Sequence, residues 1–144
     1  MTATATTGEN YVKGEFKPLE AGEYLIRMNR VTEKKSKSGN TMLKVGFQVI
    51  KKVGDEENTS KSKNRLIFEN FLIDHPKPKV NEITRDRLDK FLKAVGVEGG
   101  LTSIGEDYSK LDNYTELPFI GVVGIKEGDN GYPDSNTIKA FKRR

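Results

Sequence analysis

The sequence predicts a mainly β domain of five strands, with one α-helix between the third strand and the fourth. Five short segments rich in β-forming residues carry alternating or continuous apolar patterns, and one longer segment repeats apolar residues at helical spacing. The last two strands are joined by a short run of turn-forming residues, which makes them antiparallel neighbours. This order predicts a five-stranded OB-fold barrel, and a length of 144 residues suits one such domain. A ferredoxin-like sandwich, which requires two full helices, and an open meander are the alternative layouts.

The first two strands are predicted at residues 22–31 and 42–50. In the second strand, Leu43, Val45, Phe47 and Val49 share one face, and Lys44, Gly46 and Gln48 share the other. A glycine in the middle of a strand indicates a bulge or a close approach by another backbone. The polar run at residues 32–41 contains three lysines and is predicted to be a loop.

The third strand is predicted at residues 64–73, and its two faces are both apolar, so the pattern leaves open which side faces the core. The helix is predicted at residues 79–95, and Gly96 follows at the position of a C-terminal cap. Its stripe, expected to pack on the core, consists of Val80, Ile83, Arg87, Leu88, Phe91, Leu92 and Val95. The remaining strands are predicted at residues 117–126 and 136–142, after one helical turn near residues 106–111.

Composition excludes several classes of function. The chain has no cysteine, which excludes disulfides, thiolate catalysis and Cys-based zinc sites, and its one histidine, His75, is interpreted as a loop residue. Because motifs of hydrolases, metalloproteases and nucleotide-binding loops are absent, we expect no enzyme activity, no cofactor and no metal. No apolar run has the length of a membrane span, and the N-terminus lacks the features of a secretory signal. We therefore expect a cytoplasmic protein without membrane association, with a flexible tail at residues 1–17 and the folded OB domain at residues 18–144.

Charge is unevenly distributed along the chain, although the net charge is only +4. Basic residues dominate residues 27–52 and the C-terminus, whereas acidic residues dominate residues 98–116. A positive side of this kind attracts a polyanion and releases counterions on contact. In an OB barrel, ligands lie across the second and third strands, flanked by the loops between strands one and two and between strands four and five. The cationic candidates for such a surface are Arg27, Lys34, Lys35, Lys37, Lys44, Arg65 and Lys139.

Three aromatic rings are candidates for stacking on nucleic-acid bases. Tyr132 lies in the loop between strands four and five, before a proline, and its side chain is expected to project from the loop. Phe141 is expected on the same face of the fifth strand as Lys139, and Phe68 lies on the third strand. For each ring the alternative is packing in the core. Cations that follow the phosphates, together with rings that stack on bases, are what single-strand binding requires.

Three stretches of the chain carry a resemblance to a known family. They are residues 18–24 (PLEAGEY), residues 38–43 (SGNTML) and, most specifically, residues 129–140 (DNGYPDSNTIKA). With these, the sequence resembles a phage protein family long catalogued only as a domain of unknown function, some members of which have been treated as phage single-stranded DNA-binding proteins. The resemblance implies an OB-type fold and a role in phage DNA replication or recombination, in the cytoplasm of the infected bacterial host. It carries no catalytic residues over.

We therefore expect sequence-tolerant binding and protection of single-stranded DNA. Phage or host replication and recombination proteins are the expected protein partners, and the sequence leaves open whether the chain acts as a monomer or a homodimer. Many replicative single-strand binders recruit partners through an acidic C-terminal tail, but residues 141–144 (FKRR) are basic. Recruitment through such a tail is thus not expected. The alternative function is a structural or adaptor protein of a phage, without affinity for nucleic acid.

Overall fold

The described residues form one antiparallel sheet of five strands with a single α-helix. The computed structural model describes residues 18–54, 63–105, 107–129 and 131–144. The predicted tail at residues 1–17 lies outside these residues. The strands are β2 (Gly22–Lys35), β3 (Thr41–Lys52), β4 (Leu66–Leu72), β5 (Pro118–Lys126) and β6 (Ser135–Lys142), in the spatial order β4-β3-β2-β5-β6. The helix α1 (Pro78–Ala94) follows the third of these strands, as predicted.

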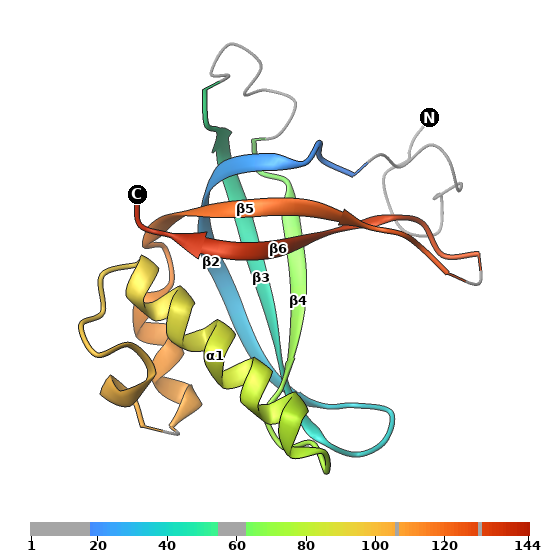
Figure 1. Cartoon of the computed structure of the whole chain (residues 1–144), viewed down its shortest axis with the longest axis vertical. Coiled ribbons are helices and arrows are strands. Elements are labelled where there is room, and N and C mark those ends of the chain that lie inside the picture. Colours follow the sequence, from blue (N-terminus) through green and yellow to red (C-terminus); the bar gives the residue numbers. More distant parts are fainter. Residues whose placement is uncertain (1–17, 55–62, 106, 130) are drawn as a thin grey trace.

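Strand β2 connects the two parts of the sheet. Its first half pairs with β5, while it pairs with β3 over nearly its full length. Its pairing with β3 is interrupted between Leu25 and Ile26 and again between Met28 and Arg30, and bulges of this kind bend a strand and increase its twist. Figure 1 shows the result: the β5–β6 hairpin crosses in front of β2, β3 and β4. The core lies between these crossing layers.

Four phenylalanine rings form the centre of the core. Phe47 of β3 lies 5.9 Å from Phe91 of α1 and 5.8 Å from Phe119 of β5, both in edge-to-face arrangements. Phe141 of β6 completes the cluster, with its ring 5.5 Å from that of Phe119. Edge-to-face pairs add to the hydrophobic gain of burying each ring. The cluster therefore joins three strands to the helix.

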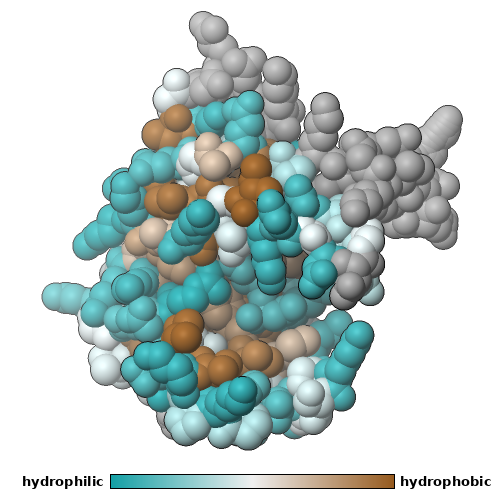
Figure 2. All heavy atoms as spheres, turned by 45° about the vertical axis from the view of Figure 1, so that its right-hand side comes forward, coloured by the Kyte–Doolittle hydropathy of each residue, from teal (hydrophilic) through white to brown (hydrophobic). Residues whose placement is uncertain are grey.

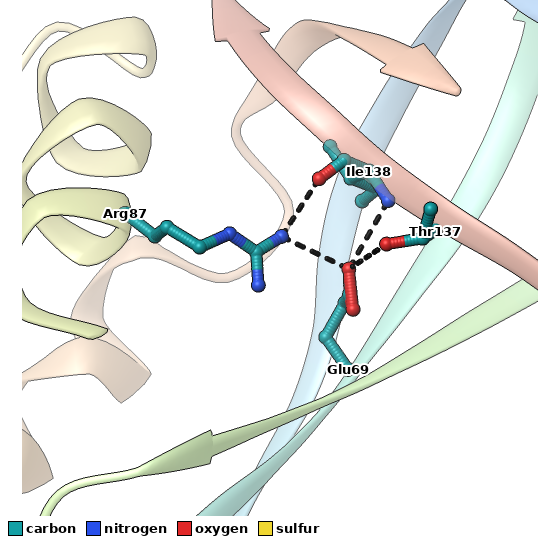
Figure 3. A network of polar contacts seen from close by, with 4 residues as sticks. All are labelled: Glu69, Arg87, Thr137 and Ile138. Atoms are coloured by element: carbon teal, nitrogen blue, oxygen red, sulfur yellow. Dashed lines mark hydrogen bonds and ion pairs between the residues drawn. The ribbon is translucent and has the colours of Figure 1, made fainter. Parts of the chain in front are cut away.

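The predicted closure into a barrel is not observed. Backbone hydrogen bonds among the described residues do not join the edge strands β4 and β6, and a side chain fills this place (Figure 3). One carboxylate oxygen of Glu69 on β4 accepts hydrogen bonds from the backbone N–H of Ile138 (3.1 Å) and the hydroxyl of Thr137 (3.0 Å) on β6. In a closed barrel, a backbone carbonyl of β4 would accept a backbone N–H of β6. Here the Glu69 carboxylate accepts the N–H of Ile138 instead.

Arg87 of α1 completes the contact between the two edge strands. Its guanidinium lies 2.9 Å from Glu69 and donates a 2.7 Å hydrogen bond to the carbonyl of Ile138. It also lies over the rings of Phe71 and Phe141, with its Cζ 5.0 Å and 5.6 Å from their centres. The one cation in the predicted apolar stripe thus binds the helix to both edges of the sheet.

The helix differs from its prediction in which face is buried. Leu88, Phe91 and Leu92 are buried as expected, but Ile83 is 52% exposed and Thr84 is buried in its place. The loop before the helix is held by Asn81, whose amide bonds the backbone N–H and C=O of His75. The His75 ring nitrogen Nδ1 accepts the N–H of Lys77. His75 is therefore a loop residue that supports the start of the helix, which agrees with its interpretation.

The segment after the helix forms two 3-10 helices, η3 (Gly100–Ser103) and η4 (Tyr108–Tyr114), where one turn was predicted. Asp89 of α1 fixes η3 by accepting the backbone N–H of Leu101 at 2.8 Å and pairing with Lys93 at 3.0 Å. These two contacts lower the pKa of Asp89. Hydrogen bonds from Ser109 lower the pKa of Asp107 in the same way. Asp89 lies on α1 and Asp107 directly precedes η4, so neither carboxylate lies on the sheet.

Candidate nucleic-acid interface

Strands β2, β3 and β4 present one face away from the core, which we call the outer face. Leu43, Val45 and Phe47 of β3 point inward and are buried, so the residues between them point outward. The outer face carries Arg27, Arg30 and Lys34 of β2; Lys44, Gly46 and Gln48 of β3; and Leu66, Phe68 and Asn70 of β4. Four of these residues are cationic and none is acidic, so this face has the charge that a polyanion requires.

An aromatic ring lies on the middle of the outer face. Arg30, Gly46 and Phe68 are register partners across the three strands, and Phe68 is 55% exposed. A Cβ atom at position 46 would lie 3.3 Å from the Phe68 ring, so the ring uses the space that the glycine leaves open. The group that approaches Gly46 is therefore a side chain, and not the backbone that the sequence predicted. The Nζ of Lys44 lies 5.2 Å from the ring centre, within range of a cation–π contact.

Arg27 is held at one end of the outer face. Its guanidinium donates to the Gln48 side-chain oxygen at 2.9 and 3.1 Å and lies 3.0 Å from a carboxylate oxygen of Glu116. The Gln48 amide in turn donates to Asn64 at 3.2 Å. Arg27 is thus oriented before any ligand arrives, and one acidic side chain partly neutralises its charge.

The lysines predicted for a long loop lie at a tight turn. Strand β2 runs four residues farther than predicted and includes Lys34 and Lys35, whereas Lys37 lies in the turn. The turn is closed by hydrogen bonds of 2.8 Å between the backbones of Ser36 and Asn40 and of Gly39 and Ser36. All three lysines are exposed, and Lys35 donates to the hydroxyl of Thr41 at 2.7 Å. The turn therefore presents its cations from an ordered hairpin.

Arg65 lies directly before β4 and is half-buried. Its carbonyl accepts the backbone N–H of Val49, which fixes this position beside β3. Arg65 thus lies near the end of the outer face that also carries Leu66.

The β5–β6 hairpin brings its candidate residues to another part of the molecule. Tyr132 is 70% exposed at the tip of this hairpin, which agrees with a projecting ring. Figure 1 shows that the β5–β6 hairpin and the β2–β3 hairpin extend in different directions, so their tips lie apart. Lys139 is exposed, and its side chain lies across Gly124 of β5. Tyr132 and Lys139 therefore do not join the outer face directly.

Phe141 packs against the core, and its predicted placement on the same face as Lys139 is wrong. Ile138 pairs with Val123 while Ala140 pairs with Val122, so a bulge interrupts β6 at Lys139. The extra residue reverses the alternation, and as a result Ile138 and Phe141 both face inward. Phe141 is partly buried and packs against the other rings of the core cluster, as in the alternative of core packing.

Sequence reasoning missed Asn29, Arg30 and Leu66 as parts of the outer face. Arg30 stands in the basic segment, but a strict alternation from Tyr24 would place it on the buried side. The bulge between Met28 and Arg30 shifts the alternation and brings Arg30 outward. Nothing in the local sequence indicates this bulge, since it depends on the pairing of β2 with β3.

Within the described ranges there is no cluster of three or more His, Cys, Asp or Glu side chains that would hold a metal ion. A helix long and apolar enough to cross a membrane is likewise not found among the described residues.

The space-filling view shows apolar patches separated by hydrophilic side chains on the face it presents (Figure 2).

Comparison with known proteins identifies a family for this chain. No curated protein matches the chain. A family model described as "Protein of unknown function (DUF669)" matches residues 5–143, which is nearly the whole chain. The chain therefore belongs to this family.

Proposed function

We propose that the protein binds single-stranded DNA across the outer face of β2, β3 and β4, with little dependence on sequence. The observation that carries this proposal is the exposed Phe68 ring beside Gly46, with the Nζ of Lys44 5.2 Å from its centre and Arg30 opposite Gly46 on β2. A ring that extends from an edge strand over the sheet, in a residue that is 55% exposed, offers a stacking platform for a base. Arg30 and Lys44 on the neighbouring strands can contact the phosphates that flank that base.

The arrangement of the strands supports an OB-type fold as part of this proposal. Numbered along the chain, the five strands lie in the order third, second, first, fourth, fifth, with the helix between the third and the fourth. This is the arrangement of an OB barrel opened between its third and fifth strands, where Glu69 and Arg87 make the bridge. In OB proteins the ligand lies across the second and third strands, which here carry Lys44 and Phe68.

The biological role we propose rests on the family resemblance together with this surface. A single-strand binder of this kind would protect DNA during phage replication or recombination in the host cytoplasm, with replication or recombination proteins as partners. No catalytic step is part of the proposal.

The test is a fluorescence-anisotropy titration with dT oligomers and a matched duplex at several salt concentrations. We expect the single strand to bind more tightly, with log K falling against log salt by about 0.7 for each phosphate neutralised. Phe68→Ala should weaken binding by about 1–3 kcal/mol, because a stacking platform is lost. Ile83→Ala on α1 is the matched control, since it removes a similarly exposed apolar side chain from another surface.

Two results would overturn the proposal. One is a duplex bound as tightly as the single strand. The other is no salt-sensitive affinity for oligonucleotides at all, which is what a structural or adaptor protein of a phage would give.

A further inference from the structure

A pocket opens on the outer face beside the Phe68 ring. It has a volume of about 420 Å³ and is lined by Asn29, Arg30, Gly46, Leu66 and Phe68. The pocket can therefore receive a flat group that contacts the aromatic ring.

The lining combines apolar walls with a polar rim. Leu66 and Phe68 are both about half exposed, and both belong to β4. Gly46 of β3 is buried beside the Phe68 ring, which takes up the space that a side chain at this position would need. Asn29 and Arg30 provide the polar groups, from β2. A planar heterocycle with hydrogen-bonding edges has the same division between an apolar face and a polar rim.

Asn29 owes its position to the bulge in β2. The register passes from Met28 opposite Phe47 to Arg30 opposite Gly46, which leaves Asn29 without a register partner on β3. Its side-chain amide makes no hydrogen bond to another described residue, whereas the neighbouring Arg27 is held by two partners. The amide is thus available to a ligand in the pocket.

We propose that this pocket binds one nucleobase of the bound strand and prefers guanine. The proposal rests on the proposed function and adds a base preference at one position of an otherwise sequence-tolerant site. The rim is rich in donors, because a guanidinium carries only donors and an amide carries two of them. Guanine presents two adjacent acceptors, O6 and N7, and the fork of an arginine matches both. Adenine carries an amino group beside N7, where guanine has O6, and this donor meets the donors of Arg30 unfavourably.

The experiment uses strands of abasic deoxyribose phosphates that carry a single base at the centre. Such probes keep the charge of DNA, and the lone base has no competitor for the pocket. Affinities are measured for strands with G, A, C or T and for the fully abasic strand. We expect the G strand to bind on the order of tenfold more tightly than the A strand or the abasic strand.

Variants connect this preference to the pocket. Asn29→Ala removes the free amide, and Gly46→Val displaces the Phe68 ring that lines the pocket, so in both the ratio of G affinity to abasic affinity should fall toward one. Asn113→Ala in η4 is the matched control and should keep the ratio of the parent. If Gly46→Val does not fold, Asn29→Ala still decides the question.

The outcomes separate the two proposals. Equal, salt-dependent binding of all five strands would overturn the base pocket and leave single-strand binding standing. No binding of these strands or of dT oligomers would overturn both. A G preference that Asn29→Ala leaves intact would assign the selectivity to another surface and reject the pocket.

Discussion

Glu116 places an acidic side chain at the end of an otherwise cationic surface. Its backbone has a φ of 72°, which is rare for a residue other than glycine, and its N–H donates to the carbonyl of Met28 at 2.9 Å. This geometry holds the carboxylate 3.0 Å from the guanidinium of Arg27. A phosphate that contacts Arg27 must compete with this carboxylate.

Replacing the acid should therefore strengthen binding. Glu116→Gln is expected to raise the affinity for a dT oligomer at low salt, and to steepen the salt dependence by up to about 0.7. Glu82→Gln on α1 is the control, because it likewise removes an exposed acid from an ion pair, in this case with Lys79. An affinity of Glu116→Gln equal to that of the parent would show that Arg27 does not contact the strand.

Tyr132 and Phe141 offer a direct contrast between an exposed ring and a packed one. Tyr132→Ala should cost about 1–3 kcal/mol in binding and little in folding, if the hairpin tip contributes a stacking ring. Phe141→Ala should cost roughly 3 kcal/mol in unfolding free energy, because it removes one ring of the core cluster. Urea denaturation and oligomer titration of both variants measure the two effects. A folded Tyr132→Ala protein that binds like the parent would exclude this hairpin tip from the interface.

At the scale of elements, the β2–β3 hairpin presents three lysines at one end of the outer face. Since Lys34 and Lys35 belong to the strand and Lys37 to a hydrogen-bonded turn, the backbone that carries these cations is fixed before a strand binds. Exposed lysines contribute little to folding, so their effect should be on binding alone.

Changing Lys34, Lys35 and Lys37 together to Ala should weaken binding and reduce the salt slope by up to about 2, or about 0.7 for each lost contact. The melting temperature should stay close to that of the parent. A triple change of Lys79, Lys90 and Lys110 removes the same charge from α1 and η4 and serves as the control. If the two triple variants lose the same amount of affinity relative to the parent, net charge alone and not the hairpin accounts for the affinity.

At the scale of the whole molecule, Glu69 and Arg87 hold together an open sheet. The Glu69 side chain is only 11% exposed and serves three donors, two of them on β6 and one on α1. Removing one partner of a mostly buried ion pair leaves the other without compensation. The two edge strands and the helix therefore depend on one another through this contact.

Arg87→Met should lower the unfolding free energy by about 2–4 kcal/mol, since the mostly buried Glu69 side chain would lose its partner on α1. The backbone amide of Ile138 should also exchange faster with solvent, because its acceptor is destabilised. Lys79→Ala, which breaks the exposed pair with Glu82, is the control and should change stability by less than about 1 kcal/mol. A stable Arg87→Met protein with a protected Ile138 amide would mean that the core cluster alone holds the edges together.

Much of the fold could be predicted from the sequence because it depends on local patterns. The alternation in β3, the helical repeat of α1 and the turn formers before β6 each act over a few residues, and they correctly predicted five strands and the position of the helix. The concentration of cations near Lys44 likewise indicated which strands form the outer face. Each of these signals is a property of one segment.

The tertiary structure decided what depends on segments far apart in the chain. Pairing between strands placed the bulges at Asn29 and Lys139, and these brought Arg30 outward and Phe141 inward. The sheet stayed open because Glu69 bonds residues nearly 70 positions away, 68 for Thr137 and 69 for Ile138. Periodicity along one strand carries no information about the register of its neighbour, and a one-residue shift exchanges the two faces. The sequence by itself therefore determined the elements and their charge, whereas their pairing determined which side chains meet on the outer face.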